Sequence, residues 1–223
     1  MVDNWDVSPA EAIAIKHRLR DQVRLEDDFG EIKTVAGVDI SIGRGWPEGK
    51  CGIVVISFDE LRVLEVCTHT APVKFPYIPG LLAFREIPLF LETYKLLQIE
   101  PDVLFSDGQG YAHPRRFGIA CHGGVLLDKP SIGCGKSKLI GYFADPGYEA
   151  GSVSPLIASD GERVGDVLRT KAGVKPVFIS PEHKVSFDTA TQLALQCTRG
   201  FRIPEPTRLA HESVSGKGVS VGL

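Results

Sequence analysis

Apolar residues recur along this chain with two different spacings. Alternation with polar residues is typical of strands, and recurrence at i, i+3 and i+4 is typical of amphipathic helices. The first pattern, together with short continuous apolar runs, predicts strands at residues 34–42, 51–58, 62–69, 103–105, 130–134 and 175–180. The second predicts helices at residues 9–24, in a run that ends at residue 97, at 114–127, at 187–199 and within 202–211. Residues 141–173 are rich in loop-forming residues, with only short stretches that could be strands.

The order of these segments predicts an α/β fold. The first three strands follow one another without an intervening helix, which indicates an antiparallel meander. Ser8-Pro9-Ala10-Glu11 is a capping box with proline at the first helical position, and it marks the start of the first helix. No repeat, low-complexity tract or linker is visible, so we expect residues 1–223 to form a single domain.

Composition narrows the class of protein. The five cysteines are scattered, odd in number and never arranged as C-x-x-C, which favours free thiols in a reducing cytoplasm over disulfides or a zinc-thiolate site. No apolar run is long enough for a membrane span, and no secretory signal is visible, so we expect a cytoplasmic protein without membrane partners. The net charge of −3 fits poorly with a large non-specific nucleic-acid binder, but it allows a nuclease whose acids gather around a metal ion.

One carboxylate lies in the middle of the first strand. In Thr34–Ile42 one face carries Ala36, Val38 and Ile40, whereas Asp39 lies on the other face. An unpaired buried charge is costly, so Asp39 needs a cation, a metal ion or a proton. A structural aspartate with a satisfied partner is the alternative interpretation.

A second carboxylate follows the apolar run 103–105. Asp107 stands before Gly108 and Gly110, and His113-Pro114-Arg115-Arg116 comes next. Ligands of open α/β sheets gather beyond the carboxyl ends of strands, and a helix N-terminus there can hold an anion. Asp-Gly alone indicates an ordinary turn, but the adjacent histidine and arginines favour a functional site.

A third carboxylate, Glu86, lies in a helical stripe with Leu82, Leu89 and Phe90 and is therefore expected to point inward. The alternative is a glutamate beside a kink at Pro88. Three inward carboxylates repel one another unless a divalent ion offsets their charge, and oxygen ligands favour Mg²⁺ or Mn²⁺ over zinc.

Two further segments carry candidate chemistry. Gly133-Cys134-Gly135-Lys136-Ser137-Lys138 is similar to part of a phosphate-binding P-loop, but Pro130 stands where that motif needs glycine, so we reject the motif and keep Lys136 as a phosphate-reaching lysine. Lys136 and His113 would add positive charge or proton transfer near the leaving oxygen.

Tyr77 lies on a loop stiffened by two prolines, from which an aromatic ring can insert at low entropic cost; an ordinary exposed tyrosine is the alternative. His183 is expected in a loop, with a structural role.

Together these segments resemble the endonuclease V family of deoxyinosine-directed nucleases. The matching segments run in family order over nearly the whole chain: V-A-G-V-D-I-S around Asp39, F-P-Y-I-P-G-L-L-A-F-R-E ending at Glu86, D-G-Q-G-Y-A-H-P-R-R-F-G from Asp107, I-G-C-G-K-S-K-L around Lys136, and R-I-P-E-P-T-R-L-A-H ending at His211. The resemblance implies a ribonuclease H-like fold with a mixed five-stranded sheet, its first three strands antiparallel, flanked by helices. It also implies Mg²⁺-dependent hydrolysis, with Mn²⁺ as a substitute, of the second phosphodiester bond 3′ to inosine.

The resemblance assigns roles to individual residues. Asp39, Glu86 and Asp107 match the metal-site acids, and His211 matches a histidine or aspartate near the metal. Lys136 matches the active-site lysine, and His113 the histidine of the central motif; with the three acids they form the expected catalytic set. Tyr77 matches a wedge that fills the gap left by a displaced base. The expected contacts to nucleic acid and lesion are Tyr77, Ile78, Pro79, Gly80, Leu82, Arg85, Gly108, Gly110, Arg115 and Gly118.

Two positions lie where relatives vary or where the chain departs from the family pattern. Gln109 falls within the range seen among relatives at the third residue of the central motif, and its role is open. Glu182 stands where the family pattern has glycine, which puts the local turn in doubt.

The expected partner is inosine-containing DNA, bound by a monomer, and inosine-containing RNA is an open alternative. A lesion-binding protein without turnover would keep Tyr77 and the glycines but would not need all the acids. A P-loop nucleotidase is disfavoured by Pro130.

Overall fold

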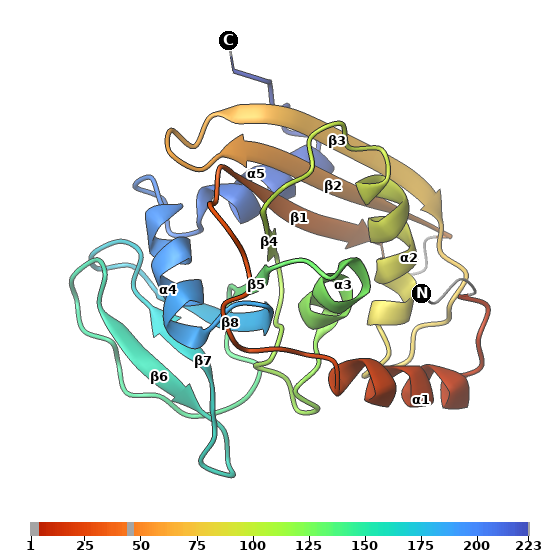
Figure 1. The fold of residues 1–223 in the computed structure, drawn as a ribbon, viewed down its shortest axis with the longest axis horizontal. Helices are drawn as coiled ribbons and strands as arrows, with labels where there is room; N and C mark the ends of the chain where they lie inside the picture. The colour runs from red at the N-terminus through yellow and green to blue at the C-terminus, as the bar shows by residue number, and fades with distance from the viewer. Residues whose placement is uncertain (1–4, 44–46, 223) are drawn as a thin grey trace.

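The computed structural model describes residues 5–43 and 47–222. Within these residues, eight strands form one sheet (Figure 1): β1 Thr34–Ile42, β2 Glu48–Ser57, β3 Val63–Pro72, β4 Val103–Ser106, β5 Ser131–Gly135, β6 Val153–Ile157, β7 Arg163–Leu168 and β8 Val177–His183. The same part of the chain forms five helices: α1 Pro9–Arg20, α2 Ala83–Tyr94, α3 Ile119–Leu127, α4 Phe187–Gln196 and α5 Glu205–Val214. None of these helices is both long and apolar enough to cross a bilayer.

The sheet has the order β3-β2-β1-β4-β5-β8-β7-β6. The expected antiparallel meander of β1, β2 and β3 is confirmed, and β4 and β5 run parallel to β1. The predicted count of five strands is wrong, because β8, β7 and β6 continue the sheet beyond β5 through antiparallel pairs. Two of these strands, β6 and β7, come from residues 141–173; they pair with each other, and β7 joins the sheet through β8.

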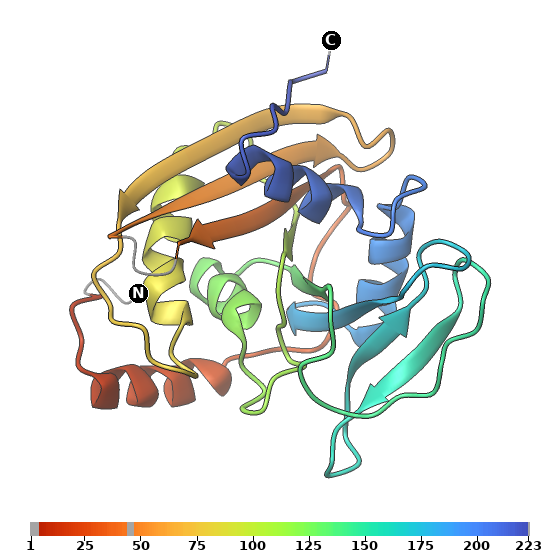
Figure 2. The same cartoon turned by 180° about the vertical axis from the view of Figure 1, so that it is seen from behind.

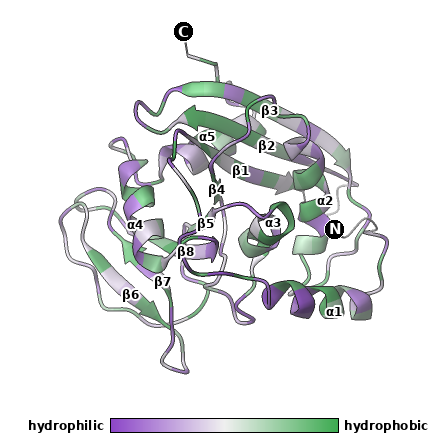
Figure 3. Ribbon diagram, in the orientation of Figure 1, coloured by the Kyte–Doolittle hydropathy of each residue, from purple (hydrophilic) through white to green (hydrophobic). Residues whose placement is uncertain are grey.

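Alternation along the strands places helices on both faces of the sheet. On β2, Ile53 and Val55 pack in a core with Ile87 of α2, whereas Val54 and Ile56 pack in a second core with Leu209 of α5. Accordingly, α2 and α5 cover opposite faces of the meander, as the two views in Figures 1 and 2 show. Figure 3 shows apolar residues concentrated on the central strands and on α3, with hydrophilic residues prominent on α1.

Several predicted boundaries move. The capping box at Ser8 is present, but α1 ends at Arg20 rather than at residue 24. The helix expected from residue 114 begins at Ile119, because Arg116 adopts the left-handed conformation (φ 54°), which a helix cannot contain. His183 ends β8 instead of lying in a loop.

The turn that contains Arg116 is held by the far end of the sheet. The Arg116 guanidinium forms ion pairs of 2.6 Å with Asp160 and with Glu162, both in the turn between β6 and β7. The Tyr111 hydroxyl donates to the same Glu162 carboxylate. Segments far apart in the sequence thus fix the path of residues 111–118.

Candidate metal centre and adjoining pocket

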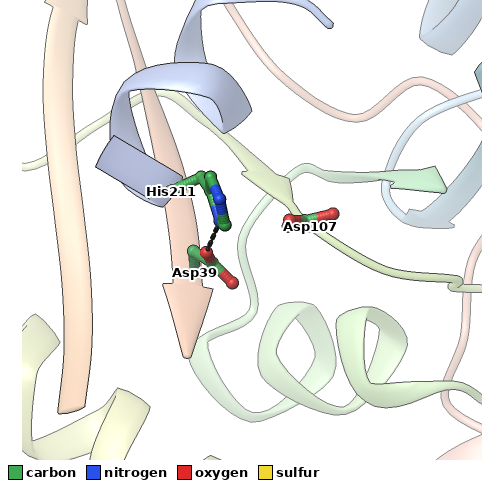
Figure 4. Close-up of side chains that lie close together, drawn as sticks. All are labelled: Asp39, Asp107 and His211. Atoms are coloured by element: carbon green, nitrogen blue, oxygen red, sulfur yellow. Dashed lines mark hydrogen bonds and ion pairs between the residues drawn. The ribbon is translucent and has the colours of Figure 1, made fainter. Parts of the chain in front are cut away.

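Three side chains from separate elements converge at one end of β1. Asp39 comes from β1, Asp107 follows the last residue of β4, and His211 comes from α5. One potential ligand atom of each lies within 4.8 Å of those of the other two, and Figure 4 shows Asp39 and His211 facing each other with Asp107 beside them. The three residues form a ready group of oxygen and nitrogen donors.

Backbone geometry brings these side chains together. The Asp107 N–H donates to Val38 O at 3.0 Å. Because Val38 precedes Asp39 on β1, this bond places Asp107 beside Asp39. Gly37 lies on the same strand face as Asp39, and a Cβ atom there would be 1.8 Å from Pro206 O. Only glycine therefore lets α5 approach β1 closely enough for His211 to reach Asp39.

Hydrogen bonds orient the group. One oxygen of Asp39 accepts from the Ile40 N–H at 2.8 Å, and the other lies 2.8 Å from Nδ1 of His211. Lys136, which follows β5, donates to Asp107 through its ammonium. Burial raises the pKa of Asp107, an effect that the hydrogen bond from Lys136 opposes.

The donor set fits a hard divalent cation. The two carboxylates are the oxygen ligands that Mg²⁺ and Mn²⁺ prefer, and the imidazole supplies one nitrogen ligand beside them. All five cysteines are free thiols, and none belongs to the group. Asp39, Asp107 and His211 are thus the residues that could hold the metal ion.

Glu86 lies close to this centre. It lines one pocket with Asp39 and Asp107 but is outside the group of mutually close ligand atoms. Burial, followed by the negative charge of Asp39, raises the pKa of Glu86 to about 7. Its inward orientation is as the sequence indicated, and its role as a metal ligand stays a prediction.

A second pocket adjoins the first. Its walls include the expected lesion-pocket residues Gly80, Leu82 and Gly118, and it shares Glu86 and Ile119 with the metal centre. The remaining lining residues are Lys16, Ala83, Gln109, His113 and Leu139. The two pockets therefore share one wall.

His113 belongs to this second pocket. Burial lowers its pKa to about 4, and the positive charges of Lys16 and Arg115 add to the effect. Its Nδ1 accepts from the Arg115 N–H at 3.1 Å. The lowered pKa favours the neutral form of His113 near pH 7, and the two roles that the sequence suggested for it stay predictions.

The proline-stiffened loop lies at the rim of the second pocket. Tyr77 is 69% exposed, as a wedge must be, and Ile78 and Pro79 accompany it on the loop. Arg85 donates to Phe75 O at 2.8 Å, and Arg115 donates to Gly80 O at 3.3 Å, so both arginines hold this loop.

The other two predicted glycines lie deeper. Gly108 and Gly110 are absent from the described walls of both pockets. A Cβ at Gly108 would contact Ile119, and one at Gly110 would be 2.4 Å from Cγ of Glu182. Both belong to the loop after Asp107, and their lack of a side chain lets Ile119 and Glu182 pack against that loop.

Gln109, whose role the sequence left open, and His183, which was expected to be structural, both have clear partners. Gln109 donates from Nε2 to Ser137 O at 2.9 Å. His183 is buried; its Nδ1 accepts from the Arg24 N–H, and its Nε2 lies 3.1 Å from Asp128. Both contacts hold chain segments together, and His183 has the structural role expected of it.

Sequence reasoning missed Lys16 and the setting of Glu182. Lys16 lies at i+4 from Ala12 and i−3 from Leu19, both buried on α1, and this spacing could have revealed an inward lysine. The Glu182 carboxyl is fully buried with no hydrogen-bond partner among the described residues. Burial holds its pKa well above the usual range, which favours the protonated form, and its side chain lies against Gly110 and Gly133.

Comparisons of this chain with a family model, with known sequences and with solved structures all find endonuclease V proteins. The family model for endonuclease V matches residues 17–212. Endonuclease V of Nostoc punctiforme is 45% identical over 214 residues, which are 96% of each chain. The crystal structure of endonuclease V from Streptomyces avermitilis is similar, with a TM-score of 0.90 and 40% identity over 96% of this chain and 94% of that one. That of Ciona intestinalis endonuclease V, in complex with DNA containing an inosine followed by a ribo-adenosine, has a TM-score of 0.81 and 30% identity over 93% and 96% of the two chains.

Proposed function

Because this chain belongs to the endonuclease V family of nucleases, which are hydrolases of phosphodiester bonds, we propose that it is a Mg²⁺-dependent DNA-repair endonuclease. Its substrate is deoxyinosine in DNA, and it hydrolyses the second phosphodiester bond 3′ to the lesion. Mn²⁺ is the expected substitute for Mg²⁺.

We further propose that the fold is ribonuclease H-like and that the chain acts as a single-domain monomer. The five strands β3-β2-β1-β4-β5, with an antiparallel meander and helices on both faces, support the first assignment. The five free thiols support a cytoplasmic location, where cysteines stay reduced.

The residues at and beside the candidate metal centre have different proposed roles in hydrolysis. Asp39, Asp107 and His211 would hold the metal ion, which when bound activates water and stabilises charge on the scissile phosphate. Lys136 brings a positive charge beside Asp107 and can stabilise an oxygen that becomes anionic. Glu86, with a pKa of about 7, can take up or release a proton near neutral pH.

The adjoining pocket would hold the displaced base. Its apolar and glycine walls suit a planar purine, which main-chain groups can read at close approach. Tyr77 at the rim would fill the gap left in the stack. The shared wall of the two pockets supports this proposal, because cleavage of a bond close to the lesion requires recognition next to the metal centre.

The observation that carries this proposal is the convergence of Asp39, Asp107 and His211 beside the base-sized pocket. The test is a nicking assay on a duplex with one inosine, and on the same duplex with adenine, with Mg²⁺ and with a chelator. We expect a single nick that needs both inosine and Mg²⁺ and is lost in Asp39→Ala and in Asp107→Ala. Unchanged cleavage in both variants would reject the mechanism.

Three related measurements separate the alternative functions from the proposed one. Faster cleavage of inosine-containing RNA than of the matched DNA would identify an inosine-specific endoribonuclease. Tight binding of the inosine duplex without a nick in Mg²⁺ or Mn²⁺ would identify a lesion-binding protein without turnover. Release of nucleotide phosphate in the absence of nucleic acid would revive the nucleotidase hypothesis.

A further inference from the structure

Lys16 is a buried lysine with an incomplete set of partners. It is only 6% exposed, although lysine is rarely buried without a compensating group. Its Nζ donates to Gly80 O at 3.1 Å, and no carboxylate pairs with it among the described residues. An ammonium group has three donors, so two remain for another acceptor.

The second pocket is one place where such an acceptor can bind. Lys16 is on the wall of the second pocket, together with Gly80, His113 and Leu139. Burial lowers its pKa to about 8, and the charge of Arg115 adds to this effect. The free donors are therefore held in a partly desolvated place, where a hydrogen bond to a ligand contributes more than it would in water.

The walls of the pocket indicate a base rather than a phosphate. Leu82, Ala83, Ile119 and Leu139 provide apolar surface, and only Lys16 among the lining residues is a cation. A phosphate would need several converging donors, whereas a purine needs flat apolar surface and one or two polar contacts.

Among the polar groups of hypoxanthine, only the 6-oxo oxygen distinguishes it from adenine as an acceptor. We propose that Lys16 donates a hydrogen bond to this oxygen and thereby determines specificity against adenine, whose 6-amino group would present its own hydrogens to the lysine. This inference rests on the proposed function and deepens it. A site built to donate to one group rejects an analogue without it, because the donor is then left unpaired.

The test is equilibrium binding with Ca²⁺ in place of Mg²⁺, measured by fluorescence anisotropy. Three duplexes differ at one position: inosine, adenine and nebularine, a purine with no 6-substituent. In Lys16→Met, affinity for the inosine duplex should fall about 10- to 100-fold, the effect of removing one charged hydrogen bond. Affinity for the nebularine duplex should be unchanged within about twofold.

Nebularine separates base reading from loop anchoring. If Lys16 only holds Gly80, Lys16→Met weakens binding of both duplexes equally, and that result overturns the inference. Lys16→Gln, which keeps a donor, should retain more of the preference for inosine over nebularine than Lys16→Met does; equal preferences in the two variants would also overturn it. Lys138→Met is the matched control, because Lys138 is exposed and outside the pocket walls, and it should affect the two duplexes equally. A wild-type protein that does not prefer inosine over adenine would instead refute the proposed function.

Discussion

Gly37→Ala is expected to disable the metal centre without changing any of its ligands. A Cβ at position 37 would lie 1.8 Å from Pro206 O, and real Cβ atoms essentially never approach closer than 3.0 Å. The difference, 3.0 − 1.8, requires a movement of at least 1.2 Å between β1 and the start of α5. Because the obstructing atom belongs to the backbone, a change of side-chain rotamer cannot relieve the clash.

The displacement is large on the scale of the site. His211 lies on α5 at 2.8 Å from Asp39, and a rigid outward shift would lengthen this contact to about 4 Å, beyond hydrogen-bond range. Overpacking of this kind costs about 1–3 kcal/mol, which corresponds to a fall in Tm of about 2–12 °C for a protein of this size. Loss of the contact that orients a metal ligand lowers metal affinity about 10- to 100-fold.

The assay compares Tm and the Mg²⁺ concentration at half-maximal cleavage. We expect Gly37→Ala to lower Tm and to need at least about tenfold more Mg²⁺. Gly30→Ala is the matched control, because nothing lies within 4 Å of a Cβ there, and it should behave as the wild type. A Gly37→Ala protein with wild-type Tm and wild-type Mg²⁺ dependence would show that α5 is not positioned by this contact.

Three further predictions concern single side chains. Tyr77→Ala should weaken binding of inosine duplexes because the proposed wedge is lost. The Tm should change little, since the ring is 69% exposed. An unchanged affinity would show that Tyr77 does not take part in recognition. His122 is fully buried among Trp5, Phe84 and Phe117, and burial lowers its pKa from 6.5 to about 3. The contribution of the neutral imidazole to the free energy of unfolding is thus present above pH 6.5 and is lost as the pH falls toward 3. In His122→Phe, the free energy of unfolding measured with urea should therefore change less between pH 7 and pH 5 than in the wild type. An equally steep fall in the variant would contradict this. Glu182 has a raised pKa, so its contribution is present below its ordinary value of 4.5 and lost as pH rises; Glu182→Gln should therefore gain stability relative to wild type from pH 5 to pH 9, and a constant difference would refute it.

The pattern of apolar positions predicted the face of the strand on which Asp39 lies, because this follows from the two-residue period of strands. The meander was predicted because three strands follow one another without an intervening helix. The apolar pattern also identified the buried stripe of α2 with Glu86. These features depend on near neighbours in the sequence, and local spacing is sufficient to find them.

Features that depend on distant partners were not predictable in the same way. β7 is a strand because it pairs with β8, and β6 because it pairs with β7; their short apolar stretches were not sufficient to establish this from the sequence. His211 was found only through the family resemblance, since its distance from Asp39 depends on the packing of α5. Lys16 was missed, although its spacing from Ala12 and Leu19 was visible.

The ion pairs of Arg116 connect the proposed base pocket to the outer edge of the sheet. Asp160 and Glu162 lie in the turn between β6 and β7, outside the walls of that pocket, yet they hold the left-handed residue that separates His113 from Gly118. Shortening that turn would remove these ion pairs and free the segment that leads to the pocket-lining residues His113 and Gly118. If the proposed function is correct, variants that alter substrate choice can therefore be sought in this hairpin, with every residue of the pocket wall left intact.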